Sequence, residues 1–238
     1  MLLFDIATPC FADTYTVAPV SMTLEADSPR GEFRLVNQEG RSLRVQIDVN
    51  RWSQEHNWNE EQTSTDFIVS PRFADIAPHG VQIVRVAYRY PVAASQELSY
   101  RVLFREIPSS VGLRKDGYVA LNYSIPLFVE PSAAHELHLA WSAIRTGPTG
   151  LLLCVDNAGG VHGKIKIHSL SKQQDVGTEL LSESDFAAMN QSKIIHYVLA
   201  GTHREMQLGL PHALDQGAQL LLSVDVNTKH QDILLTLR

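Results

Sequence analysis

Cysteine is scarce in this sequence of 238 residues, and it has no surplus of basic residues. Its two cysteines are too few for a disulfide framework, and they cannot form a structural zinc site by themselves. Lysine and arginine number 20 against 26 acidic residues, which gives a formal net charge of −6. A nucleic-acid binder normally carries a basic surplus, so this composition disfavours that class of protein.

Long hydrophobic runs are also missing. No run approaches the ~18 apolar residues that a membrane helix needs, so we expect no stable membrane insertion. Hydrophobic residues nevertheless make up 44% of the chain and charged residues only 19%. Such a composition is typical of packed cores rather than of a disordered chain.

Catalytic sequence motifs are absent as well. The chain has no glycine-rich phosphate loop, no GxSxG elbow and no HExxH pair, and no acid–base or nucleophile pairing stands out. We therefore predict that the protein is not an enzyme and holds no cofactor. The acidic segment 55–61 contains Trp58 and follows closely on Trp52, so a sugar-binding loop is one interpretation and a solvated hairpin tip the other.

The ten histidines are not spaced like metal ligands. His135 and His138 are an odd number of residues apart, which puts them on opposite faces of a strand. His162 and His168 share a face but lie about 20 Å apart along an extended strand. We predict no metal site. Cys154 follows a leucine run, so we expect a buried, inert thiol.

The chain start resembles the end of a secretory signal. Residues 1–12 are largely apolar and end in the small residue Ala12, as signal peptides do before their cleavage site. Asp5 and Pro9 interrupt the apolar run and no positive charge precedes it, so a signal-peptide remnant and an ordinary disordered N-terminus both stay open.

Alternation of apolar and polar residues is the dominant pattern. This spacing puts one face of a strand on a core and the other in water. The clearest rows are Phe33–Leu35, Val45–Val49, Val84–Tyr88, Val119–Leu127, Ile165–Ile167 and Leu220–Val226. Many short strands between turn residues predict an all-β chain of antiparallel sandwiches, with one short helix over 183–189.

A domain boundary is expected at Glu130–Ala134, where proline and small residues follow the longest row. It divides the chain into domains 13–131 and 132–238, each close to the ~100 residues of one immunoglobulin-like sandwich.

Several stretches together resemble a known family. They are Phe67–Ala77, Gln82–Val86, Tyr100–Pro108, Ile125–Pro131, Leu153–His162 and Tyr197–Gln207. In this order they resemble a periplasmic chaperone of the chaperone–usher pathway of pilus assembly, and the last two are most similar to the archaic branch. The resemblance implies two immunoglobulin-like domains in a boomerang arrangement, and it makes spore-coat-U-like pilus subunits and an outer-membrane usher the expected partners.

The resemblance also implies a mechanism without ATP. A pilus subunit of this kind lacks its last strand, and the chaperone lends it one by donor-strand complementation. The matching residues here are Val119, Leu121, Tyr123 and Ile125, although the same residues can instead fill the domain's own core. Pro126 cannot donate a main-chain hydrogen bond, so we expect an edge strand or a bulge there. A free edge would also allow a self-capping dimer.

The sequence departs from the family at the subunit anchor. Better-known members bind the subunit's C-terminal carboxylate with two basic residues, but the aligned positions here hold Ser21 and Pro126. Arg89 and Arg101 are the substitutes that we predict, with ordinary solvated arginines as the alternative.

A second departure concerns charge. In many family members an arginine before the proline that closes the donor strand forms an interdomain ion pair with the counterpart of Glu106. Here that position holds Glu130, and the two acids would repel each other if they were close, unless Arg85 or Arg105 intervenes. A secreted adhesive or pilus subunit with a sandwich fold is the alternative function. We disfavour it because a subunit should lack a final strand, and this chain continues through a full second domain.

Overall fold

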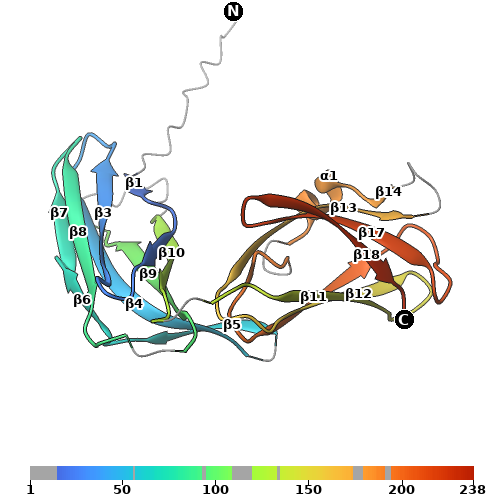
Figure 1. The fold of residues 1–238 in the computed structure, drawn as a ribbon. Coiled ribbons are helices and arrows are strands. Elements are labelled where there is room, and N and C mark those ends of the chain that lie inside the picture. Colours follow the sequence, from blue (N-terminus) through green and yellow to red (C-terminus); the bar gives the residue numbers. More distant parts are fainter. Residues whose placement is uncertain are drawn as a thin grey trace, which may run out of the picture. The chain divides into compact units, whose positions relative to one another are not determined.

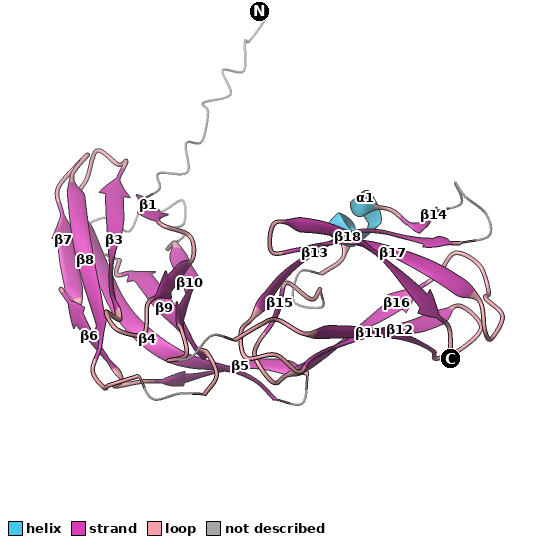
Figure 2. Ribbon diagram, viewed as in Figure 1, coloured by secondary structure: helices cyan, strands magenta, loops and turns pink. Residues whose placement is uncertain are grey.

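The computed structural model describes residues 15–55, 57–92, 95–108, 120–132, 135–173, 179–190 and 194–238. The predicted signal remnant (1–12) and Val119 lie outside the described residues. The described chain is almost entirely β-strand with one short helix, which confirms the all-β prediction (Figure 2). No helix in this described part is long and apolar enough to cross a membrane.

The chain divides into two compact units. The first holds Met1–Arg51, Thr63–Tyr90 and Tyr100–Leu127, and the second holds all the rest. The sequence suggested one cut near residue 131. In the structure two earlier segments, Trp52–Gln62 and Pro91–Ser99, group with the second unit.

Two sheets build the first sandwich (Figure 1). One has the order β1-β3-β8-β6, and the other has the order β2-β10-β9-β4-β5, with β7 paired to β4. Their bounds are β1 Tyr15–Ala18, β2 Met22–Leu24, β3 Arg30–Asn37, β4 Leu43–Glu55, β5 Trp58–Thr63, β6 Phe67–Ser70, β7 Phe73–Ile76, β8 Val81–Tyr88, β9 Leu98–Glu106 and β10 Asn122–Val129. Apolar rows from both sheets meet between them, as in the edge-to-face pair of Phe33 and Phe104, whose ring centroids are 5.3 Å apart.

The second unit is a sandwich of a three-stranded sheet, β11-β12-β16, and a sheet of order β14-β13-β17-β18 with β15 paired to β13. The bounds are β11 Leu139–Arg145, β12 Gly150–Asn157, β13 Gly163–Lys172, β14 Glu179–Leu181, β15 Tyr197–Val198, β16 His203–Gly209, β17 Gln219–Val226 and β18 Lys229–Thr236. The expected helix is α1, Glu183–Ala188, which begins in a capping box between Ser182 and Asp185.

Both units have the same hydrogen-bond arrangement around a buried asparagine at the end of one strand. At the end of β3 the side-chain amide of Asn37 donates to the main-chain oxygens of Arg41, Ile76 and Ala77. At the end of β12 the amide of Asn157 donates to the main-chain oxygens of Val161, Val198 and Leu199. Each asparagine is buried, so its three donated bonds satisfy main-chain groups that would otherwise lie unpaired in the core.

Candidate functional site

The predicted donor strand covers β10 and the residues just before it: Leu121 precedes the strand, while Tyr123 and Ile125 lie in it. Leu121 and Tyr123 are half-buried and Asn122 and Ser124 are exposed, so this segment offers surface to a partner. From Ile125 to Val129 every residue is buried. Ile125 is only 4% exposed, so its side chain packs inside the protein and has little surface left for a subunit.

Strand β10 is not an edge strand along its whole length. In the sheet it lies between β2 and β9, which corrects the simple expectation raised by Pro126. Strand β2 has three residues and β10 has eight, so β2 cannot pair along all of that side. In the described part of the chain no other strand pairs with the rest of that side, which makes it a candidate surface for strand addition.

Tyr15 of β1 holds the start of the segment in place. Its hydroxyl donates to the main-chain oxygens of Phe104, at 3.0 Å, and Leu121, at 3.3 Å. In return the hydroxyl of Tyr123 donates to the main-chain oxygen of Tyr15 at 2.6 Å, and the two rings meet edge to face. The half-buried side chain of Tyr123 is thus already positioned by the protein itself.

Glu106 fixes the same segment from β9. Its Oε2 accepts from the main-chain N–H of Leu121 at 3.1 Å, and its own N–H donates to the Leu121 oxygen at 3.3 Å. The Glu106 carboxylate is almost fully buried, and Arg41 Nη2 lies 3.1 Å from its Oε1. A buried carboxylate requires such charge and hydrogen-bond compensation.

Sequence reasoning missed Arg41. Of the two cations suggested beside Glu106, Arg85 pairs with Glu32 and Arg105 pairs with Asp48. The ion pair that does form joins residues 65 positions apart, and no local pattern marks it. The hydrogen bond from the main-chain N–H of Leu121 to the Glu106 carboxylate could not be predicted either, because it depends on how the start of β10 is aligned with the end of β9.

The structure does not bring the two predicted anchors together. Arg89 follows β8 in the four-stranded sheet, and its Nε donates to the main-chain oxygen of Phe67 at 3.3 Å. Arg101 lies on β9 in the other sheet, where its Nη1 is 3.4 Å from both the main-chain oxygen and the hydroxyl of Ser124. Arg101 is therefore the cation beside the candidate donor segment.

The tryptophan pair does not form a sugar platform. Trp52 is 3% exposed, and its Nε1 donates to Asn59 Oδ1 at 3.1 Å. Trp58 is 72% exposed, so the two rings differ in accessibility rather than lining one surface. Strand β4 ends at Glu55 and β5 begins at Trp58, so the acidic segment 55–61 reaches from the hairpin turn into β5. All residues of β5 are exposed, which agrees with a solvated segment rather than a binding loop.

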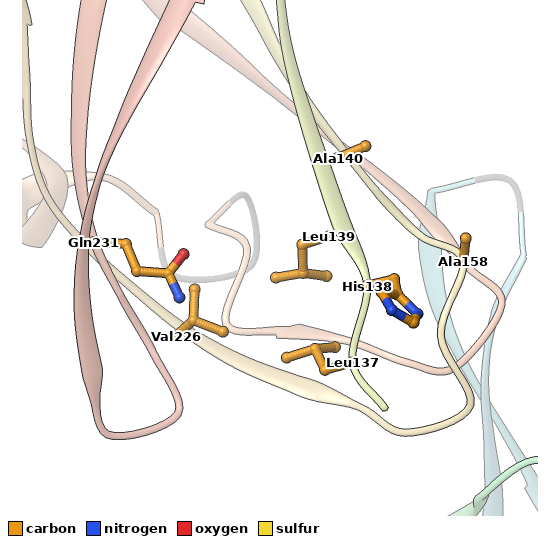
Figure 3. A pocket seen from close by; sticks show the side chains of 7 residues that line it. All are labelled: Leu137, His138, Leu139, Ala140, Ala158, Val226 and Gln231. Carbon is orange, nitrogen blue, oxygen red and sulfur yellow. The ribbon is translucent and has the colours of Figure 1, made fainter. Parts of the chain in front are cut away.

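Two shallow hollows lie in the second unit. One, of about 380 Å³, is drawn in Figure 3, where Leu137 and Leu139 point toward Val226 while His138 lies on the other side of its strand. The other, of about 390 Å³, lies by Asn57 and Thr202. Neither combines a buried charge with the enclosure that a small-molecule site usually has.

Solved structures share the fold. A chain in the structure of the CsuC–CsuE chaperone–tip adhesion subunit pre-assembly complex of Acinetobacter baumannii archaic Csu pili matches with a TM-score of 0.64 and 21% identity, covering 94% of this chain and 99% of that one. The Pseudomonas aeruginosa CupB2 chaperone matches with a TM-score of 0.57 and 14% identity, covering 94% and 100%. The fold is thus the two-domain β-sandwich of pilus chaperones. A search of the curated proteins gives no match.

The family follows from the sequence itself. Residues 15–135 match the model of the pili and flagellar-assembly chaperones, PapD N-terminal domain. The chain belongs to this family of pilus-assembly chaperones, which is not an enzyme class. That finding also sets aside the adhesive-subunit alternative.

Proposed function

We propose that the protein works in the periplasm, where it binds pilus subunits by lending them the first half of β10 and delivers them to an outer-membrane usher. The observation that carries this proposal is the change of exposure within β10. Its last five residues are buried, whereas Leu121 and Tyr123 keep part of their surface and lie beside an incompletely paired edge. An extended partner would pair with that edge and receive the alternate side chains.

Preorganisation supports this role. The bonds from Tyr15 and Glu106 hold Leu121 before any partner arrives. A segment that is already ordered loses less conformational entropy on binding, so more of the interaction energy appears as affinity. Val119 extends the same apolar row toward its N-terminal end and belongs to the proposed contact surface, and Ile125 belongs to it only if the strand shifts.

Arg101 is the better candidate for the subunit's terminal carboxylate, because it lies beside Ser124 on the donor strand. Arg89 remains the second candidate. An arginine that binds a carboxylate in a partly desolvated interface contributes more than a solvated surface pair. The relatives named above include an archaic system, and the resemblance in Leu153–His162 supports assigning the protein to that branch with spore-coat-U-like clients.

Co-expression tests the proposal. Residues 13–238, behind a working signal peptide, would be produced with a candidate subunit encoded nearby, and the tagged chaperone would be weighed by native mass spectrometry. We expect a one-to-one complex, and degradation of the subunit when the chaperone is omitted. A subunit that is equally stable and unbound without the chaperone would refute the proposal.

Self-capping is a related proposal. Without a client, the accessible β10 edge would be covered by a second copy of the chain. Sedimentation of the free protein should then show a dimer that a bound subunit converts to the one-to-one complex. A free protein that stays monomeric at the highest concentration would contradict self-capping alone.

A further inference from the structure

Three side chains from three neighbouring strands converge on the outer face of the second unit. His168 comes from β13, Asp225 from β17 and His230 from β18. His168 Nε2 lies 2.8 Å from one carboxylate oxygen of Asp225, and His230 Nδ1 lies 2.9 Å from the other. The three groups each offer a ligand atom, and these atoms all lie within 4.8 Å of one another.

His168 lies at a β-bulge. The pairing of β13 with β17 shifts between Ile167 and Ser169, so His168 is the extra residue of the bulge. Ile167 is buried and His168 is only half-buried, so the imidazole keeps the accessible face that alternation along β13 gives it. The bulge acts on the residues that follow, where Leu170 rather than Ser169 is buried. The register of β17 and β18 places Asp225 directly opposite His230.

The outer nitrogens of both imidazoles also have partners. His168 Nδ1 is 3.5 Å from Glu183 Oε2 on α1. His230 Nε2 is 3.2 Å from the Ser223 hydroxyl and 3.5 Å from Asp232 Oδ1. Metal-binding histidines usually donate their second N–H to a carboxylate or another acceptor, which fixes the tautomer. Without an ion the inner nitrogens donate to the Asp225 carboxylate. An ion bound there would replace these hydrogen bonds, and each neutral imidazole would then carry its single proton on the outer nitrogen, where an acceptor is already in place.

Charge favours a divalent cation here. With neutral imidazoles the cluster holds the carboxylates of Asp225, Glu183 and Asp232 against the ammonium of Lys166, which pairs with Glu183 at 2.8 Å. Two imidazoles and a carboxylate suit a borderline transition ion such as Zn²⁺, which binds three protein ligands and water at about 2.0–2.2 Å.

We propose that His168, Asp225 and His230 form a binding site for a divalent transition-metal ion of the zinc class on the β13-β17-β18 face. The ion would tie three strands of one sheet together. It would bind the folded unit and not the unfolded chain, so it would raise the unfolding temperature. This site is separate from β10, and its failure would leave the chaperone proposal untouched.

Calorimetric titration of the whole, tag-free chain with ZnCl₂ tests the site. We expect one ion per chain, with the affinity lowered at least tenfold in His168→Gln, His230→Gln and Asp225→Asn. Glu183→Gln, which touches only the outer nitrogen, should weaken binding less. The matched control is His203→Gln, since His203 belongs to a separate group with Cys154 and Glu205 and should leave this binding unchanged.

Circular dichroism would show that each variant is folded, and the zinc-induced rise of the unfolding temperature gives a second readout. That rise should occur in the wild type and in His203→Gln and be lost in His168→Gln. Absence of binding at 100 μM zinc, or binding that only His203→Gln weakens, would overturn the proposal.

Discussion

The start and the end of the predicted donor strand differ in burial. Residues 125–129 of β10 are buried, while Leu121, just before β10, and Tyr123 keep accessible surface. The buried half of β10 stabilises the chaperone itself. Residues 121–124 are held by Tyr15 and Glu106 rather than by deep packing, so under the proposed function they could bind a partner without unfolding the chaperone.

Of the substitutions that test this comparison, Leu121→Glu should have the largest effect, which is on client binding. A charge placed in the groove of a subunit would lose the apolar contact and be desolvated, so we expect client binding to be abolished. Because Leu121 is only half-buried, the variant should stay folded. Pull-down of the subunit and thermal unfolding would be measured side by side, and an unfolded variant would place Leu121 in the chaperone's own core.

Leu127→Ala should act on the other half. Leu127 is fully buried, and removing such a side chain costs about 2–5 kcal/mol of unfolding free energy through lost burial and the cavity left behind. Denaturant titration would measure the loss. Client affinity, measured at denaturant concentrations well below the unfolding transition, should change little. A loss of client affinity without a loss of stability would contradict the difference proposed between the two halves of β10.

Arg101→Ala tests the anchor. If Arg101 binds the subunit carboxylate, its removal should weaken client capture by roughly 2 kcal/mol or more. Arg105→Ala is the matched control, because Arg105 lies on the same strand but pairs with Asp48. Arg89→Ala tests the second candidate. If client affinity is unchanged in both the Arg89 and the Arg101 variant, neither arginine binds the subunit carboxylate.

Cys154→Ser should have the smallest effect. The thiol is buried, and burial raises its pKa, with Glu205 and Asp156 adding to the rise, so it is a poor nucleophile near neutral pH. Subunit assembly in cells should proceed as in the wild type. Loss of assembly in a stably folded variant would indicate a role for the thiol.

Period-two alternation was sufficient to predict those strands that bury only one face. Rows such as Val45–Val49 and Leu220–Val226 are buried at alternate positions, as expected when one strand face meets a core. The short helix was also predictable, because Ser182 and Asp185 form a local capping box. The candidate donor segment stays a prediction that rests on the same alternation together with the family resemblance.

Features that depend on strand register were not predictable. The Arg41–Glu106 pair and the His168–Asp225–His230 cluster bring together strands far apart in sequence, and a one-residue bulge moves the next buried position of β13 from Ser169 to Leu170. Alternation also stops at Ile125, because residues 125–129 are buried on both faces. The side-chain bonds at the Asn37 and Asn157 corners were equally hidden, because each amide reaches main-chain oxygens 39–42 positions further along the chain.

Amide hydrogen exchange tests the central claim most directly. Exchange of the free chaperone would be compared with that of its one-to-one complex with a subunit. We predict that protection rises most at residues 121–124 and changes little at 125–129, which are already buried. Protection that appears elsewhere while residues 121–124 exchange as fast as in the free protein would contradict donation of β10.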